Sequence, residues 1–373
     1  MLEFIIWNGS PELFSYNQFA LRWYGLLFAL GFLVSQQILY YMYRKEGKPE
    51  KDVDTLTIYM IVATILGARL GHVFFYQPEL LWQSPLSVLL PFEFSPFRFT
   101  GFQGLASHGA AIGILFALWL YSRKKKPGQN YMQILDRIVI LVCIAGCFIR
   151  LGNFFNSEII GKPSSNPLAI VFASRITESI MRDTDGSNPV AYTQIKKSDL
   201  PPGQNSRMPI DIVILFKKGI DEDRATSFVT NEVKYYLVQL NEFVDEPAMT
   251  PLNFQVVKEQ DGSFAARIQT FGIARHPAQL YEAISCLILF AFFLWYWSRY
   301  KINLPEGRIF GMFMIALWTL RFAYEFLKEN QVSFEDQLKL NMGQLLSIPL
   351  VIVGILVLIR SYKKPGTEIQ DAS

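Results

Sequence analysis

Long apolar stretches separated by short basic loops dominate the chain. A helix needs about 20 mostly apolar residues to cross the hydrocarbon core of a bilayer. Seven stretches meet this requirement, and they cover residues 19–41, 56–76, 105–121, 134–151, 279–297, 309–326 and 342–359. The pattern therefore predicts an all-α polytopic membrane protein with seven transmembrane helices.

Basic residues indicate the orientation of these helices, because cytoplasmic loops carry an excess of Lys and Arg. The loops after the first, third, fifth and seventh stretches hold fourteen Lys and Arg, whereas those after the second and sixth hold three. This asymmetry predicts an N-terminus outside and a C-terminus in the cytoplasm. No basic segment or small-residue cleavage site marks the first stretch as a signal peptide, so we expect it to be retained.

A polar segment, residues 163–275, separates the fourth and fifth stretches. Residues 210–216 and 254–257 have the composition of strands, and apolar residues recur near helical spacing over 221–241. The sequence thus predicts three parts: helices one to four in 1–162, an inserted extracytoplasmic α+β domain in 163–275, and helices five to seven with a cytoplasmic tail in 276–373.

Composition narrows the class of protein further. Charged residues make up 18% of the chain, against about 25% in an average soluble protein, which disfavours a disordered, fibrous or nucleic-acid-binding protein. The three cysteines, Cys143, Cys147 and Cys286, lie in apolar runs without ligand spacing, so we expect neither a metal site nor a disulfide framework. The chain also lacks a nucleophile elbow, an HExxH motif and a P-loop, which argues against a hydrolase, a zinc protease and an NTPase.

Ionisable residues within the apolar stretches are the strongest candidates for function, since each costs about 2.5–3.5 kcal/mol to insert into a bilayer. Helical spacing places Arg150, Asn153 and Ser157 near one face of the fourth stretch, with Glu158 beside them. On the predicted topology a set of ionisable groups converges toward the outer leaflet. Its members are His108, Arg150, Glu158, His276, Glu282, Arg321 and Glu325.

These residue types suit chemistry on an anionic phospholipid. Guanidinium groups bind phosphate oxygens through two parallel hydrogen bonds and stay charged when desolvated. A histidine, with a pKa near 6.5, is the usual proton carrier at neutral pH. The cluster therefore indicates a reaction in which a phosphate group leaves a lipid and a second substrate supplies the nucleophile.

The motifs resemble those of a known family. The segment RLGNFFNSEIIG at 150–161 resembles the signature of bacterial phosphatidylglycerol–prolipoprotein diacylglyceryl transferases. Further matches follow the family's order: RWYG at 22–25, GARLG at 67–71, SHG at 107–109, HPAQLYE at 276–282, Arg321 with Glu325-Phe326, and GQLLS at 343–347. Six supporting matches in order, on an independently predicted topology, make the resemblance specific.

This resemblance implies an enzyme of the bacterial inner membrane with multiple spans. Such an enzyme transfers the diacylglyceryl group of phosphatidylglycerol to the lipobox cysteine of a lipoprotein precursor. The product is a thioether, and glycerol phosphate is released, which is the first step of lipoprotein maturation. The partners implied are phosphatidylglycerol, lipobox-bearing signal peptides and membrane lipid, with no nucleic acid, no metal and no cofactor.

The resemblance also implies roles for individual residues. Arg150 and Arg321 would bind the headgroup phosphate, His108 is the candidate base, and Tyr24 is a polar partner near the reaction centre. Either Glu158 or Glu282 could serve as the base instead. The residues expected to bind substrate are Asn153, Glu158, Gly161, Glu282, Glu325 and Gln344. Lys328 stands where the family often has arginine, which weakens a phosphate-binding role there.

Two other classes of function use similar charges. A transporter or lipid flippase would place them along a translocation path and would show internal repeats, but no repeat between the halves is visible. A lipid-binding scaffold without activity is the other alternative, against which the intact candidate set argues. Only a transferase forms a covalent product, so a transfer assay separates the three.

Overall fold

The computed structural model describes residues 4–16, 19–85, 88, 92–94, 97–99, 106–183, 186–201, 203–329 and 339–363. The chain forms two compact units, each assembled from segments far apart in the sequence. The first comprises Met1–Leu30, Gly146–Ser285 and Leu320–Ser347. The second comprises Gly31–Ala145, Cys286–Thr319 and Ile348–Ser373.

Six helices among the described residues are long and apolar enough to cross a membrane. They are α1 (Trp23–Lys45), α2 (Lys51–Tyr76), α6 (Tyr131–Phe155), α10 (Ala278–Tyr300), α11 (Arg308–Tyr324) and α12 (Met342–Lys363). A seventh apolar helix, α5 (Ser107–Ser122), has 16 residues. Its predicted first residue, Leu105, lies outside the described residues. The fold is therefore that of a polytopic membrane protein.

Glycines allow α2 and α5 to pack closely within the second unit. A Cβ added to Gly67 would lie 2.6 Å from the carbonyl oxygen of Gly109, and one added to Gly71 would lie 2.5 Å from the Cα of Gly109. Gly113 similarly faces the carbonyl oxygen of Ala63. Small residues are favoured in membrane helix contacts because they let two backbones approach.

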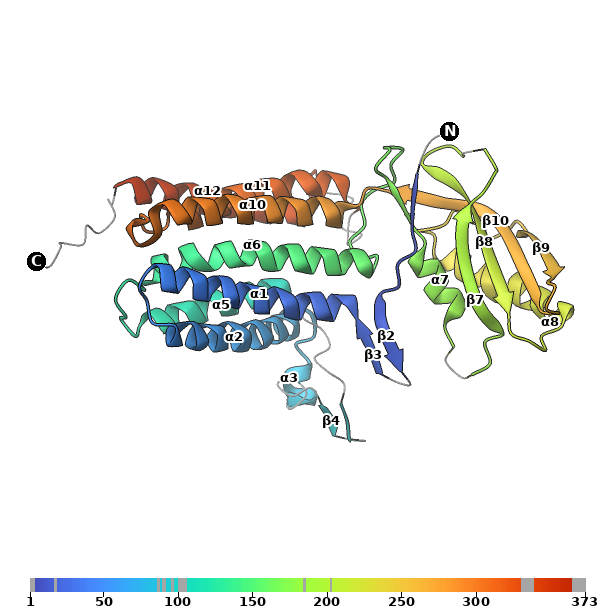
Figure 1. Ribbon diagram of the computed structural model, residues 1–373, viewed down its shortest axis with the longest axis horizontal. Helices are drawn as coiled ribbons and strands as arrows, with labels where there is room; N and C mark the ends of the chain where they lie inside the picture. The colour runs from blue at the N-terminus through green and yellow to red at the C-terminus, as the bar shows by residue number, and fades with distance from the viewer. Residues whose placement is uncertain are drawn as a thin grey trace, which may run out of the picture. The chain divides into compact units, whose positions relative to one another are not determined.

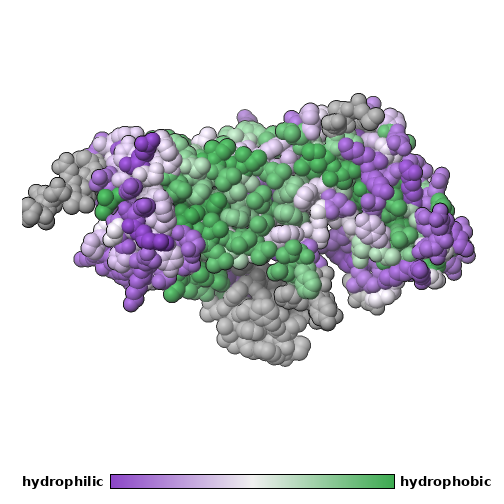
Figure 2. Space-filling view, viewed as in Figure 1, coloured by the Kyte–Doolittle hydropathy of each residue, from purple (hydrophilic) through white to green (hydrophobic). Residues whose placement is uncertain are grey.

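The helices of the second unit carry apolar side chains on the outside as well as between them. Phe293 of α10 packs against Phe313 of α11, and Gly311 of α11 approaches Leu358 of α12, so these helices run alongside one another (Figure 1). Large apolar side chains such as Ile112 and Leu356 are 62% exposed, and Figure 2 shows the apolar surface that covers this part of the protein. A surface of this kind is stable when lipid replaces water around it.

A six-stranded sheet forms the largest part of the first unit (Figure 1). Its main path runs β1 (Ile5–Trp7), β6 (Ile170–Phe172), β10 (Phe264–Arg275), β8 (Arg207–Phe216) and β7 (Val190–Lys197), and β9 (Asn253–Lys258) pairs with β10. In this sheet β1 and β6 pair in parallel, and the other pairs of described strands are antiparallel. Strand β10 is the centre of this sheet, because it contacts three others.

Helices cover one face of the sheet and enclose a core. They are α7 (Ser174–Met181), α8 (Glu222–Ser227) and α9 (Lys234–Gln239). Their buried residues, including Ile176, Ala225 and Leu237, share one hydrophobic core with residues of β8 such as Ile212 and Ile214. Burial alternates over the last residues of β8, where Ile212, Ile214 and Phe216 are buried. Together with the covering helices, these residues give this part of the unit its own hydrophobic core.

Several boundaries differ from the sequence prediction for identifiable reasons. Phe19–Arg22 is strand β3, which pairs with β2 (Glu12–Tyr16), so the first apolar helix begins at Trp23. The helix predicted over 221–241 is interrupted by one π-helical segment, Phe228–Val233. Strand β1 joins the sheet from the N-terminal segment, which the sequence grouped with the helices.

The second unit also holds α3 (Leu80–Gln83), β4 (Phe92–Phe94) and β5 (Phe97–Phe99).

Candidate functional site

A continuous chain of ion pairs joins three parts of the sequence within the first unit. Near the end of α6, Nε of Arg150 lies 2.5 Å from Oε2 of Glu282 in α10. The other oxygen of Glu282 pairs with Nζ of Lys328. That Nζ lies 3.6 Å from Oε1 of Glu325, which is also 3.7 Å from a guanidinium nitrogen of Arg321. The two predicted phosphate-binding arginines thus stand at opposite ends of an Arg–Glu–Lys–Glu–Arg chain.

Burial within this chain is deepest at its centre. The side chain of Lys328 is 5% exposed, that of Glu282 is 11% exposed and that of Arg150 is 22% exposed, whereas Arg321 is 41% exposed. Three cations face two carboxylates, so the five side chains carry one excess positive charge. Because electrostatic attraction is stronger where water is partly excluded, the arrangement is suited to binding an anion with a single negative charge.

The signature segment extends the charged chain toward a loop. A guanidinium nitrogen of Arg150 donates to the side-chain oxygen of Asn153 at 3.3 Å, and the amide of Asn153 donates to Glu158 at 3.4 Å. The amide of Asn156 donates to the other oxygen of Glu158 at 3.3 Å. Glu158 itself is exposed. Its carboxylate is therefore held by neutral amides, while that of Glu282 is held by two cations.

Gly161 lies where two other segments cross the signature loop. Its N–H donates to the carbonyl oxygen of His276 at 2.9 Å. A Cβ at this position would lie 2.7 Å from that same oxygen and 2.9 Å from the carbonyl oxygen of Leu327. Only glycine fits between these backbones without displacing them, which explains a glycine at this predicted site position.

Gln344 supports the site indirectly. It forms a capping box with Asn341 at the start of α12: the N–H of Gln344 donates to the Asn341 side chain at 2.9 Å, and the N–H of Asn341 donates to the Gln344 side chain at 3.1 Å. The Asn341 amide then donates to Oε2 of Glu325 at 3.1 Å. Gln344 thus orients Asn341, which fixes Glu325.

Tyr24 and His108 belong to different units. Tyr24, in the first turn of α1, packs on Gly152, where an added Cβ would lie 2.9 Å from the tyrosine ring, so it adjoins the signature segment. His108, in the first turn of α5, is exposed and contacts the ring of Phe75, with ring centres 4.9 Å apart. The ring of Tyr76 lies 6.0 Å from the same histidine.

His276 precedes α10 and lies beside Gly161 in the first unit. One of its ring nitrogens, Nδ1, is 3.3 Å from the hydroxyl of Tyr281. Burial lowers the pKa of His276 below its usual value of 6.5, because the surroundings disfavour the charged ring. The neutral form is therefore favoured at neutral pH.

Sequence reasoning missed two residues that contact this site, Arg275 and Asn341, and it gave Lys328 only a weakened role. Lys328 and Arg275 lie just outside apolar stretches, where a basic residue is usually a solvated topology signal. The signal for Asn341 was present, since Asn followed three residues later by Gln at the start of an apolar run is typical of a capping box.

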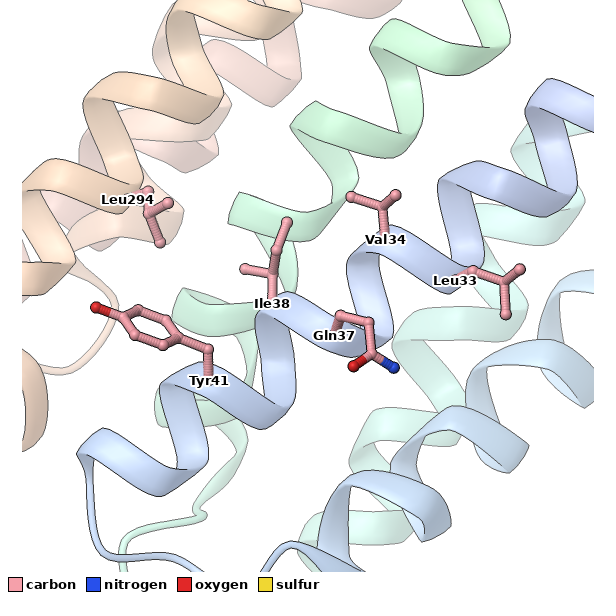
Figure 3. A pocket seen from close by; sticks show the side chains of 6 residues that line it. All are labelled: Leu33, Val34, Gln37, Ile38, Tyr41 and Leu294. Atoms are coloured by element: carbon pink, nitrogen blue, oxygen red, sulfur yellow. The ribbon is translucent and has the colours of Figure 1, made fainter.

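A pocket of about 350 Å³ lies elsewhere, in the second unit (Figure 3). It is lined by Leu33, Val34, Gln37, Ile38 and Tyr41 of α1 and by Leu294 of α10. No lining residue is charged at neutral pH, and the lining is almost entirely apolar. The pocket therefore lacks the cations that a phosphate group requires.

The fold is that of a polytopic membrane protein, and its candidate site is a partly buried chain of ion pairs with one excess positive charge. The comparisons with known proteins agree with this class. The sequence pattern of the prolipoprotein diacylglyceryl transferase family matches residues 11–360, and the chain belongs to that family. The resemblance predicted from the motifs is thereby confirmed.

Three curated relatives match this chain along almost their whole length. A protein of Bacteroides fragilis is 34% identical over 371 residues, covering 99% of both chains. One of Tolumonas auensis is 30% identical over 360 residues, covering 96% of this chain and 98% of the relative. One of Chloroherpeton thalassium is 29% identical over 366 residues, covering 98% and 97%. Each is named phosphatidylglycerol–prolipoprotein diacylglyceryl transferase.

Proposed function

We propose that this transferase moves the diacylglyceryl group of phosphatidylglycerol to the lipobox cysteine of a prolipoprotein. The cysteine sulfur attacks the glycerol carbon that carries the phosphate ester. A C–S bond forms, the C–O bond to phosphate breaks, and its electron pair leaves on glycerol phosphate. Family membership and the names of the relatives support this reaction.

The observation that carries the proposal is the ion-pair chain with an arginine at each end. A phosphodiester has one negative charge, which matches the excess positive charge of Arg150, Lys328 and Arg321 over Glu282 and Glu325. As the C–O bond breaks, the phosphate gains a second negative charge. Fixed cations stabilise that developing charge, which is the usual way a site accelerates such a departure.

A base is needed because a thiol with a pKa of about 8.5 is mostly protonated at neutral pH. We retain His108 as the candidate, with Glu158 as the alternative. Glu158 is exposed and is held by amides, so it is available to accept a proton. Glu282 is less suited, since both of its oxygens are already occupied by ion pairs with Arg150 and Lys328.

The membrane arrangement proposed here has seven spans, with the N-terminus outside and the C-terminus in the cytoplasm of the inner membrane. The 16 residues of α5 extend about 24 Å, somewhat less than the hydrocarbon thickness of about 30 Å, and local bilayer thinning accommodates such a difference. The apolar composition of α5 and its packing on α2 support a span. This topology makes 163–275 an inserted extracytoplasmic domain.

The test of the reaction is direct. Purified protein in phosphatidylglycerol vesicles is incubated with a lipobox peptide, without metal or nucleotide, and the peptide is analysed by mass spectrometry. The proposal expects a mass gain of one diacylglyceryl unit on cysteine, and none on a peptide with serine at that position. His108→Ala and Glu158→Gln then compare the two bases. Vesicles of phosphatidylcholine serve as the lipid control, and an adduct formed equally in them would contradict the proposed donor.

A further inference from the structure

The loop that carries Glu158 is held in an unfavourable backbone conformation. Ser157 has a φ of 51° and Ile159 a φ of 55°. Both values lie in the left-handed region, which residues other than glycine rarely adopt, and this is least favourable for a β-branched residue such as isoleucine. Such a conformation persists only where neighbouring groups fix it.

The end of β10 and the start of α10 fix this loop from outside. The Gln279 side chain donates to the carbonyl oxygen of Glu158. At the other end, the Gly161 carbonyl accepts a hydrogen bond from a guanidinium nitrogen of Arg275 at 3.1 Å. The N–H of Gly161 donates to the His276 carbonyl oxygen. Three residues within five positions therefore hold both ends of a four-residue segment.

Arg275 makes the most connections in this stretch, and its side chain is 6% exposed. Its Nε donates to the carbonyl oxygen of Glu242 at 2.6 Å, beyond the end of α9. The nitrogen that contacts Gly161 also lies 2.7 Å from a carboxylate oxygen of Glu329, next to Lys328. One guanidinium group thus joins three segments: the turn after α9, the signature segment 150–161, and the segment that holds Lys328.

We infer that Arg275 is a positioning residue for diacylglyceryl transfer. It acts through Gly161 and Glu329 and thereby keeps Glu158 and Lys328 in their places. The planar fork of arginine supplies several donors in fixed directions, whereas lysine supplies a single flexible ammonium group. The inference rests on the proposed function. It adds Arg275, the last residue of β10, to the residues that support the reaction.

The test compares Arg275→Ala and Arg275→Lys with Arg267→Ala as a matched control. Arg267 lies on the same strand and pairs with Asp211, but its side chain is 52% exposed and it contacts none of the site. Transfer to the lipobox peptide is measured as kcat and as KM for phosphatidylglycerol, together with thermal unfolding in detergent. Loss of hydrogen bonds to a charged group predicts that Arg275→Ala lowers kcat/KM about ten- to a hundredfold.

The expected pattern is a fall mainly in kcat, a partial recovery in Arg275→Lys, and wild-type kinetics in Arg267→Ala. Activity of Arg275→Ala within twofold of wild type would overturn the inference. If Arg275→Ala does not fold, Arg275→Lys decides, and a folded Arg275→Lys enzyme with wild-type kcat contradicts the inference equally. A wild-type protein that forms no adduct would instead refute the proposed function, so the two failures are distinguishable.

Discussion

Removing the charge of Glu282 by Glu282→Gln tests the ion-pair chain most informatively. This carboxylate holds both Arg150 and Lys328, and its side chain is 11% exposed. Taking one partner from a buried ion pair costs about 3–5 kcal/mol. We expect the lower end of that range, because Lys328 keeps Glu325 and Arg150 keeps Asn153 as partners.

The lipid should reverse part of this loss. In Glu282→Gln, Arg150 and Lys328 lose the carboxylate that they share. A bound phosphate would replace this carboxylate, so phosphatidylglycerol should give the variant a greater gain in stability than it gives wild type. For comparison, a ligand at a hundred times its Kd stabilises by about 2.7 kcal/mol. The assay is thermal unfolding in a neutral detergent, with and without phosphatidylglycerol.

Glu178→Gln is the matched control for this variant. Glu178 pairs with Arg175 on the surface of α7, with 43% of the arginine side chain and 27% of the glutamate side chain exposed. Exposed pairs of this kind contribute about 0–1 kcal/mol, so this variant should unfold like wild type. Equal stability of Glu282→Gln and wild type in detergent would refute the ion-pair reasoning. If phosphatidylglycerol stabilises Glu282→Gln and wild type by the same amount, the proposal that this ion-pair chain binds the lipid phosphate is refuted.

Three further predictions concern packing, pH and topology. Gly161→Ala should lose about 1–3 kcal/mol of stability, or most transfer activity, because the added Cβ would lie 2.7 Å from the carbonyl oxygen of His276 and 2.9 Å from that of Leu327. Unchanged thermal unfolding and unchanged transfer would contradict this packing. Burial lowers the pKa of His276 in the folded protein below 6.5, so the unfolded state binds the proton more readily. The stability of the protein should therefore fall as pH decreases below about 6.5. A His276→Gln variant with the same pH dependence of Tm as wild type would contradict this prediction. Alkaline phosphatase fused after residue 126 should be inactive and fused after residue 200 active, and the reverse would contradict the proposed orientation.

Much of the site could be predicted because charges in apolar stretches are costly. Arg150, Arg321 and Glu325 stood out for this reason, and the structure joins them through Glu282 in one chain of contacts. Lys328 was not expected to hold the centre of the site, because it follows the apolar stretch, where a lysine normally reaches water. Only the tertiary structure shows that its ammonium group is buried between two carboxylates.

The fold shows a similar division between local and distant information. The length of the apolar stretches predicted the apolar helices, and local composition predicted the strand within β8, since both signals depend on neighbours in the sequence. The parallel pairing of Ile5–Trp7 with Ile170–Phe172 could not be predicted, because it joins segments that no local pattern relates. The strained backbone at Ser157 and Ile159 was equally hidden, since its stabilising partners come from Arg275 to Gln279.

We propose that Arg150 and Arg321 bind the phosphate of phosphatidylglycerol from opposite ends of one ion-pair chain. The most direct test of this claim is the Kd for phosphatidylglycerol of folded Arg150→Ala and Arg321→Ala, with phosphatidylcholine as the comparison lipid. We predict that each variant binds phosphatidylglycerol about tenfold or more weakly, as loss of a charge-assisted hydrogen bond implies, while any phosphatidylcholine binding is unchanged. Wild-type affinity for phosphatidylglycerol in both variants would contradict the claim.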